Sequence, residues 1–327
     1  MQRDLLEILR CPKTGRRLRL QQPEYRGGRI CSGWLVSEDG GHRYAIRDFI
    51  PRFVPESNYA DNFGMQWNKF RQTQLDSHSG LPISADRFWR ATSWNSTDIT
   101  GQWVLDAGCG AGRFAEVALQ AGAKVIALDY SSAVDACYAN LKHYLNLHVV
   151  QGDICTPPFP TGFFPYVYCL GVLQHTPNPQ HSFGALLTFL GPGGKVAIDI
   201  YERNVRSLLS WKYLLRPVTT HVRKDRLFYW VEHAVHALLP AAILLRRIGG
   251  SFGARLLPVL QYSHLGLPNE LNREWAVLDT FDMYSPVYDI PQTVSTVRDW
   301  FEIGELENVL VERGPNGVVG RGRKKVA

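Results

Sequence analysis

The sequence lacks several features that would define its class at once. No uninterrupted apolar run approaches the roughly 20 residues that span a bilayer. The opening residues, MQRDLLEILRCPKTG, break their apolar positions with charges, which argues against a signal peptide. Only six cysteines occur, scattered mostly inside apolar segments, as in a reducing compartment rather than a disulfide framework. We therefore expect a folded cytoplasmic chain with free thiols.

An excess of one charge is also small. The net charge is +6 in 327 residues, and 45% of residues are hydrophobic and 20% charged, which are ordinary values for globular proteins. The positive charge favours a polyanion or an anionic membrane only weakly. The length is sufficient for a full α/β core with an accessory module.

From residue 101 onward, strand-like and helix-like segments alternate. The strand-like segments are QWVLDAG, AKVIALDY, LHVVQGD, PYVYCLGV and KVAIDIY. Such alternation indicates a doubly wound parallel sheet. The chain ends differently, with ENVLVER and GVVGRGRK joined by the turn GPNG, which predicts an antiparallel strand pair. We expect an α/β, Rossmann-like fold with a mostly parallel seven-stranded sheet and an antiparallel C-terminal hairpin.

Composition divides the chain into three regions. Residues 1–55 are expected to form a small β-rich module, residues 56–100 a helical lead-in rich in aromatics, and residues 101–327 the main domain. An insertion at about 202–290 is expected to form a helical cap over the substrate site. The simplest interpretation is a solvated cap with one apolar face. Its apolar, arginine-edged segment also fits contact with a lipid or a membrane surface.

The segment VLDAGCGAGRF carries three glycines between a predicted strand and a predicted helix. This geometry brings backbone N–H groups and a helix N-terminus close to a ligand. The glycines Gly108, Gly110 and Gly112 are spaced G-x-G-x-G, which disfavours the G-x-G-x-x-G loop that binds a dinucleotide pyrophosphate. Asp106, just before the loop, would repel a diphosphate but suits an ammonium group. Asp129, at the end of the second strand, is placed to accept ribose hydroxyls.

At the end of the third strand, Asp153 and Ile154 are placed to meet an adenine. An amino-acid tail, a ribose and an adenine together describe S-adenosylmethionine. In the lead-in, Gln66 and Trp67, with Phe70, are predicted to close over this cofactor, although packing on the main domain explains them as well.

Residues 101–201 and the C-terminal hairpin resemble the class I S-adenosylmethionine-dependent methyltransferases. VLDAGCGAGRFAEVALQAGAKVIALDYS is similar to the first two motifs of that family, GDI with PFPTGFF to the third, and LGVLQHTPNP to the loop after the fourth strand. The family usually has F-D where this chain has Phe164 and Pro165, and proline is tolerated at the first residue of a strand. The resemblance implies cofactor contacts by Asp106, Gly108, Cys109 and Gly110 around the methionine, Asp129 at the ribose, Tyr130, Asp153 and Ile154 at the adenine, and Leu170 to Gln174 along the cleft.

The first 55 residues resemble the small zinc-knuckle family that activates tRNA and protein methyltransferases. The similarity lies in LLEILRCP, in Cys31 and in YAIRDFIPRFV. Two C-x-x-C pairs would need cysteine in place of Thr14 and Trp34. One cysteine in each half, even with His42 nearby, does not supply the four ligands of a structural zinc site. We expect the fold of the knuckle without its metal, and no metal elsewhere.

The residues that promote catalysis are the hardest to predict. Methyl transfer is an in-line displacement, so alignment and exclusion of water matter most, and a base is needed only where the acceptor must lose a proton. His175, in the loop after the fourth strand, is a reasonable base. Tyr284 and Tyr288, at the end of the cap, are predicted to lie over the site. All three fit a structural role equally well.

The sequence therefore predicts an S-adenosylmethionine-dependent enzyme that methylates an oxygen or nitrogen of a small, biosynthetic or lipid-like acceptor. One alternative is an RNA or protein methyltransferase, favoured by the positive charge and the tail RGRKK. No aromatic residues interleave with the basic cluster in a recognisable RNA-binding motif, so nucleic acid is not predicted as a partner. The other alternative is a methyltransferase-like scaffold that binds no cofactor.

Overall fold

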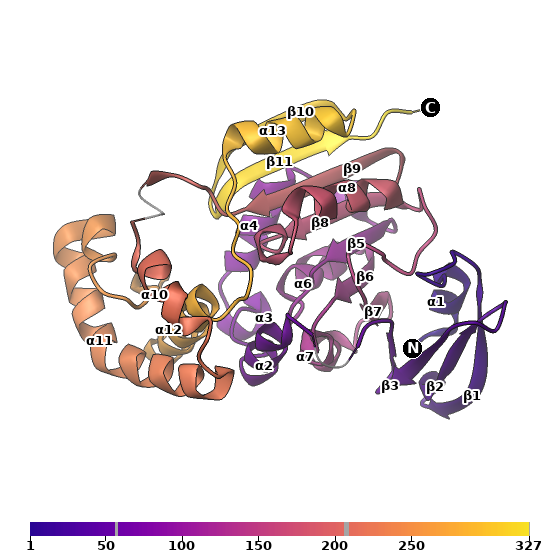
Figure 1. Ribbon diagram of the computed structural model, residues 1–327, viewed down its shortest axis with the longest axis horizontal. Helices are drawn as coiled ribbons and strands as arrows, with labels where there is room; N and C mark the ends of the chain where they lie inside the picture. The colour runs from indigo at the N-terminus through magenta and orange to yellow at the C-terminus, as the bar shows by residue number, and fades with distance from the viewer. Residues whose placement is uncertain (56–57, 206–208, 327) are drawn as a thin grey trace.

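The computed structural model describes residues 1–55, 58–205 and 209–326 of the chain (Figure 1). Its centre is one sheet of eleven strands in the order β1-β2-β3-β4-β7-β6-β5-β8-β9-β11-β10. The main domain consists of β5 (Trp103–Ala107), α6 (Arg113–Gln120), β6 (Lys124–Asp129), α7 (Ala133–Leu141), β7 (Leu147–Gln151), β8 (Phe164–Leu170), the 3-10 turn η1 (Leu173–His175), α8 (Pro179–Phe189), β9 (Leu190–Ile200), α13 (Val294–Ile303), β10 (Glu307–Gly314) and β11 (Gly317–Arg323).

The predicted fold class is confirmed. The five strands β7, β6, β5, β8 and β9 are parallel, whereas β11 is antiparallel to β9 and β10 is antiparallel to β11. These seven strands are the predicted set. The strand order reverses next to β5, so the carboxyl ends of β5 and β8 flank the crevice where α/β sheets bind ligands.

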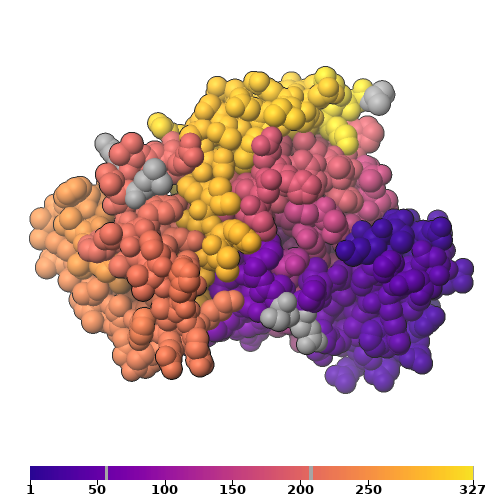
Figure 2. Space-filling model, in the orientation of Figure 1, coloured from indigo at the N-terminus to yellow at the C-terminus, as the bar shows by residue number. Residues whose placement is uncertain are grey.

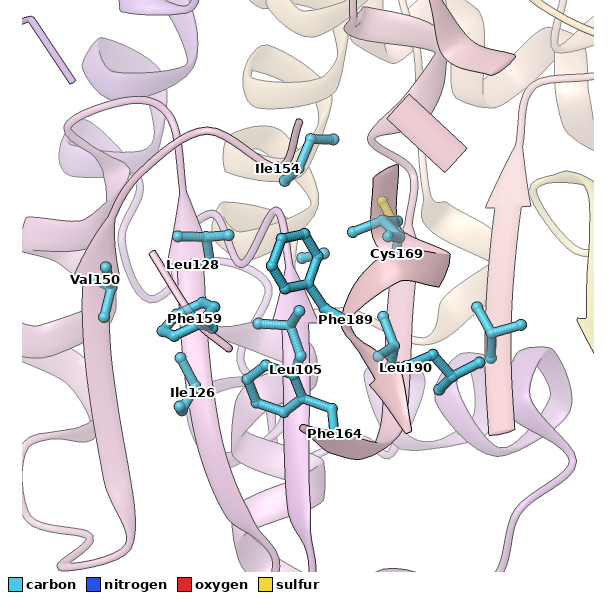
Figure 3. Close-up of a cluster of buried hydrophobic side chains, with 14 of the residues drawn as sticks. Leu105, Ile126, Leu128, Val150, Ile154, Phe159, Phe164, Cys169, Phe189 and Leu190 are labelled. Atoms are coloured by element: carbon cyan, nitrogen blue, oxygen red, sulfur yellow. The ribbon is translucent and has the colours of Figure 1, made fainter. Parts of the chain in front are cut away.

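Alternate residues of each central strand pack on opposite faces of the sheet. In β5, Val104 belongs to a buried cluster with Phe114 of α6, whereas Leu105 belongs to a second cluster with Phe183 of α8. Figure 3 shows part of the second cluster, where Leu105 and Ile126 lie near Phe164. Both faces are therefore apolar, as expected for a sheet covered by helices on each side.

Four N-terminal strands extend the sheet beyond the predicted seven. The elements of this region are α1 (Arg3–Ile8), β1 (Leu18–Arg26), β2 (Arg29–Ser37), β3 (Arg43–Arg47) and β4 (Ile50–Arg52). Strand β4 pairs with β7 in parallel, with Arg52 opposite Gln151, so the sheet is continuous into the main domain. The boundary at residue 55 stays a prediction, but these strands cover what would otherwise be an exposed edge at β7.

The start of β8 and the turn before β9 differ from the prediction. Pro165 is the second residue of β8, and the register with β9 shifts between Phe164 and Tyr166. Phe164 pairs with Leu190, so β9 begins there and includes GPGG, which was expected to form a turn before the strand. Proline has no N–H to donate to the neighbouring strand, and the register shift between β8 and β9 falls at this residue.

The lead-in and the cap are helical. The lead-in comprises α2 (Asp61–Lys69), α3 (Asp76–Ser79), α4 (Ile83–Thr92) and α5 (Ser96–Ile99), and the cap comprises α10 (Trp211–Thr219), α11 (Lys224–Gly253), the 3-10 turn η2 (Ser263–Leu265) and α12 (Asn269–Tyr284). The expectation that no segment could span a membrane is wrong by length and composition, because the 30-residue α11 meets both requirements. The mean hydropathy of its most apolar stretch is 1.4, so a few charged residues do not prevent the helix from meeting the requirement. About a third of its most apolar stretch is buried against the rest of the cap.

The junction between β4 and the main domain generates a prediction about stability. Arg52 donates to Gln151 Oε1 at 2.9 Å and to Asp135 Oδ1 at 2.6 Å, and its side chain is only 9% exposed. Replacing Arg52 with Ala leaves both acceptors without this partner, so we expect the free energy of unfolding to fall by about 1–3 kcal/mol. Urea unfolding followed by circular dichroism measures this change.

The matched control is Arg16→Ala, which removes the exposed ion pair with Asp39 at 3.6 Å. Exposed pairs contribute little, so this variant should unfold like the parent. Equal stability of the two variants would show that Arg52 does not anchor the N-terminal strands.

Candidate active site

One cavity of about 430 Å³ lies at the carboxyl ends of the five parallel strands. Each of these strands, or the residues directly after it, contributes to the lining: Gly108 after β5, Asp129 at the end of β6, Asp153 after β7, Leu170 at the end of β8 and Tyr201 after β9. The lead-in and the cap supply the rest of the wall. Segments from the lead-in, the main domain and the cap therefore enclose a single space.

The glycine loop follows a path that excludes side chains. Gly108 has φ +100°, and a Cβ there would lie 2.4 Å from Cγ2 of Val172. Gly110 has φ +51°, and a Cβ there would lie 3.2 Å from the indole nitrogen of Trp67. Both residues, with Cys109 between them, line the cavity. The loop therefore presents bare backbone to a ligand, as the spacing of its glycines predicted.

Asp129 is held in place by three hydrogen bonds. Its Oδ2 accepts from the Gly110 amide at 2.9 Å, and its Oδ1 accepts from the amide and hydroxyl of Ser131 at 2.8 and 2.7 Å. Burial raises the pKa of this carboxyl group, and these bonds oppose the rise. Asp129 lines the cavity, so a sugar hydroxyl can reach the remaining lone pairs of a carboxylate whose orientation is already set.

Two buried polar side chains near the loop are incompletely satisfied. Asp106 is 2% exposed, and its Oδ2 has no hydrogen-bond partner among the described residues. Burial raises the pKa of Asp106 to about 8. The neighbouring Tyr168 hydroxyl opposes this rise, and the charge of Asp129 adds to it. The side-chain amide of Gln174, fully buried, likewise has no partner within the described part of the chain. Neither residue lines the cavity itself. Such groups normally require a partner, which a ligand or a bridging water supplies.

Tyrosines surround the position predicted for the adenine. Tyr130, Asp153 and Ile154 all line the cavity, as the motifs indicated. Tyr59 stacks on Tyr130 with ring centroids 5.0 Å apart and also lines the cavity, a contribution that was not predicted. Its position just before α2 carried no motif that could have identified it.

The three residues predicted to close over the cofactor lie in α2 or directly after it, and only one of them lines the cavity. Trp67 lines the cavity against the glycine loop. Gln66 does not line it, because its amide nitrogen donates to Asp282 Oδ1 of α12 at 3.0 Å. Phe70 packs on Phe228 of α11, with ring centroids 5.9 Å apart. Helix α2 therefore connects the glycine loop to the cap.

His175 lines the cavity with a defined orientation. Its Nδ1 lies 3.0 Å from the backbone carbonyl oxygen of Tyr288, and its ring lies between Phe63 and Tyr201, at centroid distances of 5.0 and 5.5 Å. A carbonyl oxygen only accepts, so in the neutral ring Nδ1 carries the hydrogen and Nε2 keeps a free lone pair. Burial lowers the pKa of His175, which favours this neutral form.

The two predicted tyrosines lie beside the cavity rather than in its wall. The hydroxyl of Tyr284 donates to the carbonyl of Pro258 at 2.9 Å, within the helical cap. Tyr288 contributes its carbonyl to His175, and its ring meets Tyr59 edge-on with centroids 5.3 Å apart. A catalytic role for either hydroxyl stays a prediction, and the contacts described here are structural.

Helix α12 supplies a mainly polar part of the cavity wall. Asp279, Asp282 and Met283 have the spacing of one helix face and line the cavity together. The hydroxyl of Tyr262 donates to Asp279, and burial raises the pKa of that carboxyl group to about 6. The hydroxyl of Tyr201 donates to Asp282 at 3.4 Å. The sequence shows this helical periodicity, but no motif marks these residues as part of a site.

Cations complete this part of the wall, and none was predicted. Arg87 of α4 forms a bidentate pair with the buried carboxylate of Asp199 at 2.8 to 3.1 Å. Lys212 of α10 contacts the buried Asp289 at 2.8 Å. Arg113 donates to Ser84 and Gln74, and burial lowers the pKa of its guanidinium group to about 10. Sequence motifs could not find these residues, because their partners come from distant segments.

The comparisons with known proteins agree with this geometry. Residues 105–198 match a family described as Methyltransferase domain. A ubiquinone biosynthesis O-methyltransferase of Coxiella burnetii is 29% identical over 147 residues, which cover 41% of this chain and 63% of that protein. A protein with the same description from Acinetobacter baumannii is 26% identical over 160 residues, covering 46% and 68%. The chain thus spans less than two thirds of the first of these relatives.

Two solved structures have a similar fold. PigF with SAH has a TM-score of 0.49 at 13% identity, covering 83% of this chain and 63% of that one. The CurJ carbon methyltransferase has a TM-score of 0.44 at 11% identity, covering 83% and 62%. Both scores lie below 0.5, so the fold is assigned from its own strand order.

The class follows from the site and the matched domain together. The chain contains an S-adenosylmethionine-dependent methyltransferase domain of the class I fold, and the predictions of enzyme class and cofactor are confirmed. The residues present fit the cofactor, because a bare glycine cradle and the fixed carboxylate of Asp129 line one cavity, and the carboxyl group of Asp106 lies buried directly before the glycine loop.

Asp129→Ala tests the ribose contact. We expect S-adenosylhomocysteine to bind about 10- to 100-fold more weakly, since hydrogen bonds to charged groups contribute about 1.5–3 kcal/mol. The melting temperature should change much less than the affinity. Isothermal titration and thermal melts measure the two effects, with Asp98→Ala, which removes a partly exposed pair with Lys195, as control. Equal losses of affinity and stability would identify Asp129 as a structural carboxylate.

The raised pKa of Asp106 predicts that cofactor binding releases a proton. With a pKa of about 8, its carboxyl group is mainly protonated at pH 7, and a cationic ligand group beside it favours ionisation. Cofactor binding at pH 7 should therefore release about one proton. Titration in buffers of different ionisation enthalpy measures this number. Asp106→Asn should bind with no such release, and a release unchanged in this variant would exclude Asp106 as its source.

Proposed function

We propose that the protein transfers a methyl group from S-adenosylmethionine to an oxygen or nitrogen atom of a small-molecule acceptor. The observation that carries this proposal is the single cavity, which joins the glycine loop and Asp129 to His175 and to the polar wall of α12. When bound, the cofactor supplies an electrophilic methyl group. The chain's own residues then align the acceptor and exclude water.

His175 is proposed to accept the proton of the acceptor. Its Nε2 is the free nitrogen of a ring that the Tyr288 carbonyl orients, and its lowered pKa keeps it neutral near pH 7. A hydroxyl acceptor needs such a base because it must lose its proton on methylation. Asp279 and Asp282 are proposed to hold polar hydrogens of the acceptor through their free lone pairs.

Oxygen is the favoured target atom. The matched relatives are named as O-methyltransferases of ubiquinone biosynthesis, and Leu260 and Met283 of the cap give the cavity an apolar part that fits a lipid-like group. The degenerate zinc-knuckle character of the N-terminal strands also stays a proposal. It is supported by the sequence alone, and Cys11 contacts the hydroxyl of Tyr44 at 3.3 Å.

The acceptor class can be tested without knowing the acceptor. The protein is incubated with S-adenosylmethionine carrying a radioactive methyl group and a cell extract, which is then separated into organic-soluble, RNA and protein fractions. We expect enzyme-dependent label in the organic-soluble fraction. Label confined to RNA or protein would establish the alternative class, and no transfer to any fraction would favour a non-catalytic scaffold.

The role of His175 predicts a selective loss of turnover. His175→Gln should lower kcat by about 10²–10⁴-fold toward the acceptor that the labelling experiment identifies, with cofactor affinity unchanged. Because burial lowers the pKa of His175, kcat of the parent should stay constant as pH falls to 6.5 and decrease only below that value. His181→Gln, on the exposed start of α8, is the control. An unchanged kcat in His175→Gln would remove this residue from proton transfer.

A further inference from the structure

The outward face of α11 is unusually apolar for an exposed surface. Tyr229 and Trp230 are 58% and 54% exposed, and Leu244 and Ile248 are 56% and 78% exposed. These residues recur at helical spacing on one side of α11. The opposite side, including Val235, is buried against the rest of the cap. In Figure 1, α11 runs along the outer edge of the molecule, at the end away from the N-terminal strands.

Charges are confined to the ends of this face. Between Arg226 and Arg246 the one charged residue is Glu232, whose carboxylate lies 3.6 Å from the ammonium group of Lys69. Arg226 and Arg247 are exposed at the two ends, and Arg255 is exposed shortly after the helix. His233 and His236 are also exposed on α11. The surface is therefore an apolar strip with aromatic residues near one end and arginines at both ends.

We propose that this face of α11 docks on an anionic membrane surface, with the helix lying in the plane of the interface. Tryptophan and tyrosine favour the headgroup region, leucine and isoleucine favour the acyl boundary, and arginines pair with anionic headgroups. The inner face remains packed on α12, so the helix lies on the membrane and does not cross it. The proposal is independent of the identity of the acceptor.

A second hollow gives this surface a position relevant to the active site. It has a volume of about 780 Å³ and shares Ser210, Lys212 and Met283 with the lining of the cofactor cavity. It is also lined by Arg255 and Leu257, directly after the end of α11. The space-filling view shows the cap and the N-terminal strands at opposite ends of the molecule (Figure 2). The hollow that adjoins the site therefore lies beside the C-terminal end of α11.

Vesicle sedimentation tests the proposal with the full chain. We expect it to sediment with mixed phosphatidylcholine and phosphatidylglycerol vesicles, and less with phosphatidylcholine alone. The double variant Leu244→Glu, Ile248→Glu should bind at least about tenfold more weakly, because it places charges where apolar side chains enter the interface. Both positions are exposed, so the melting temperature should not change.

The matched control is Leu145→Glu, at an equally exposed leucine whose carbonyl contacts Gln2 among the N-terminal elements. It should bind vesicles like the parent. Absence of binding by the parent, equal binding by the double variant, or equal binding to both kinds of vesicle would overturn the proposal. So would a dimer in sedimentation velocity that the double variant dissociates, because the face would then be covered by a second copy.

Discussion

The cofactor site depends on the hydrogen bond from the Gly110 amide to Asp129, which acts beside the bonds from the Gly108 and Cys109 amides to the carbonyl of Leu128. It joins the turn after β5 to the end of β6, and Ser131 holds the other oxygen of the same carboxylate. The turn can take this path only because its glycines adopt positive φ angles and have no Cβ to meet Val172 or Trp67. The carboxylate and the bare backbone are therefore positioned together before any ligand arrives.

Burial then determines the electrostatics of the cavity. Removing carboxyl groups from water raises the pKa of Asp106 to about 8 and that of Asp279 to about 6, whereas it lowers the pKa of His175. All three changes favour neutral groups. Near pH 7 the carboxyl group of Asp106 and the ring of His175 are therefore mainly neutral, whereas Asp279 stays mainly ionised.

The cap and the lead-in act as one wall because polar contacts join them. Gln66 of α2 donates to Asp282 of α12, and the indole nitrogen of Trp275 donates to the carbonyl of Thr73. Phe70 packs on α11 as well. Residues in and next to α2 therefore contact the outer helix on one side, and Trp67 of α2 lies against the glycine loop on the other.

The sequence by itself determined the fold class and the cofactor half of the site. Alternating strands and helices, the glycine loop and the carboxylates at strand ends are local patterns, and parallel strands bring such ends together at one edge. It also indicated His175, whose location in the cavity follows from its place after β8.

Only the tertiary structure decided the rest. Arg87 and Asp199 become partners because the lead-in packs on β9, and Tyr262 and Asp279 become partners within the cap. The same holds for the pairing of β4 with β7, because a strand of three residues is too short to show a pattern in the sequence. Long-range contacts have no local pattern, because they depend on where whole elements lie rather than on the spacing of residues within them.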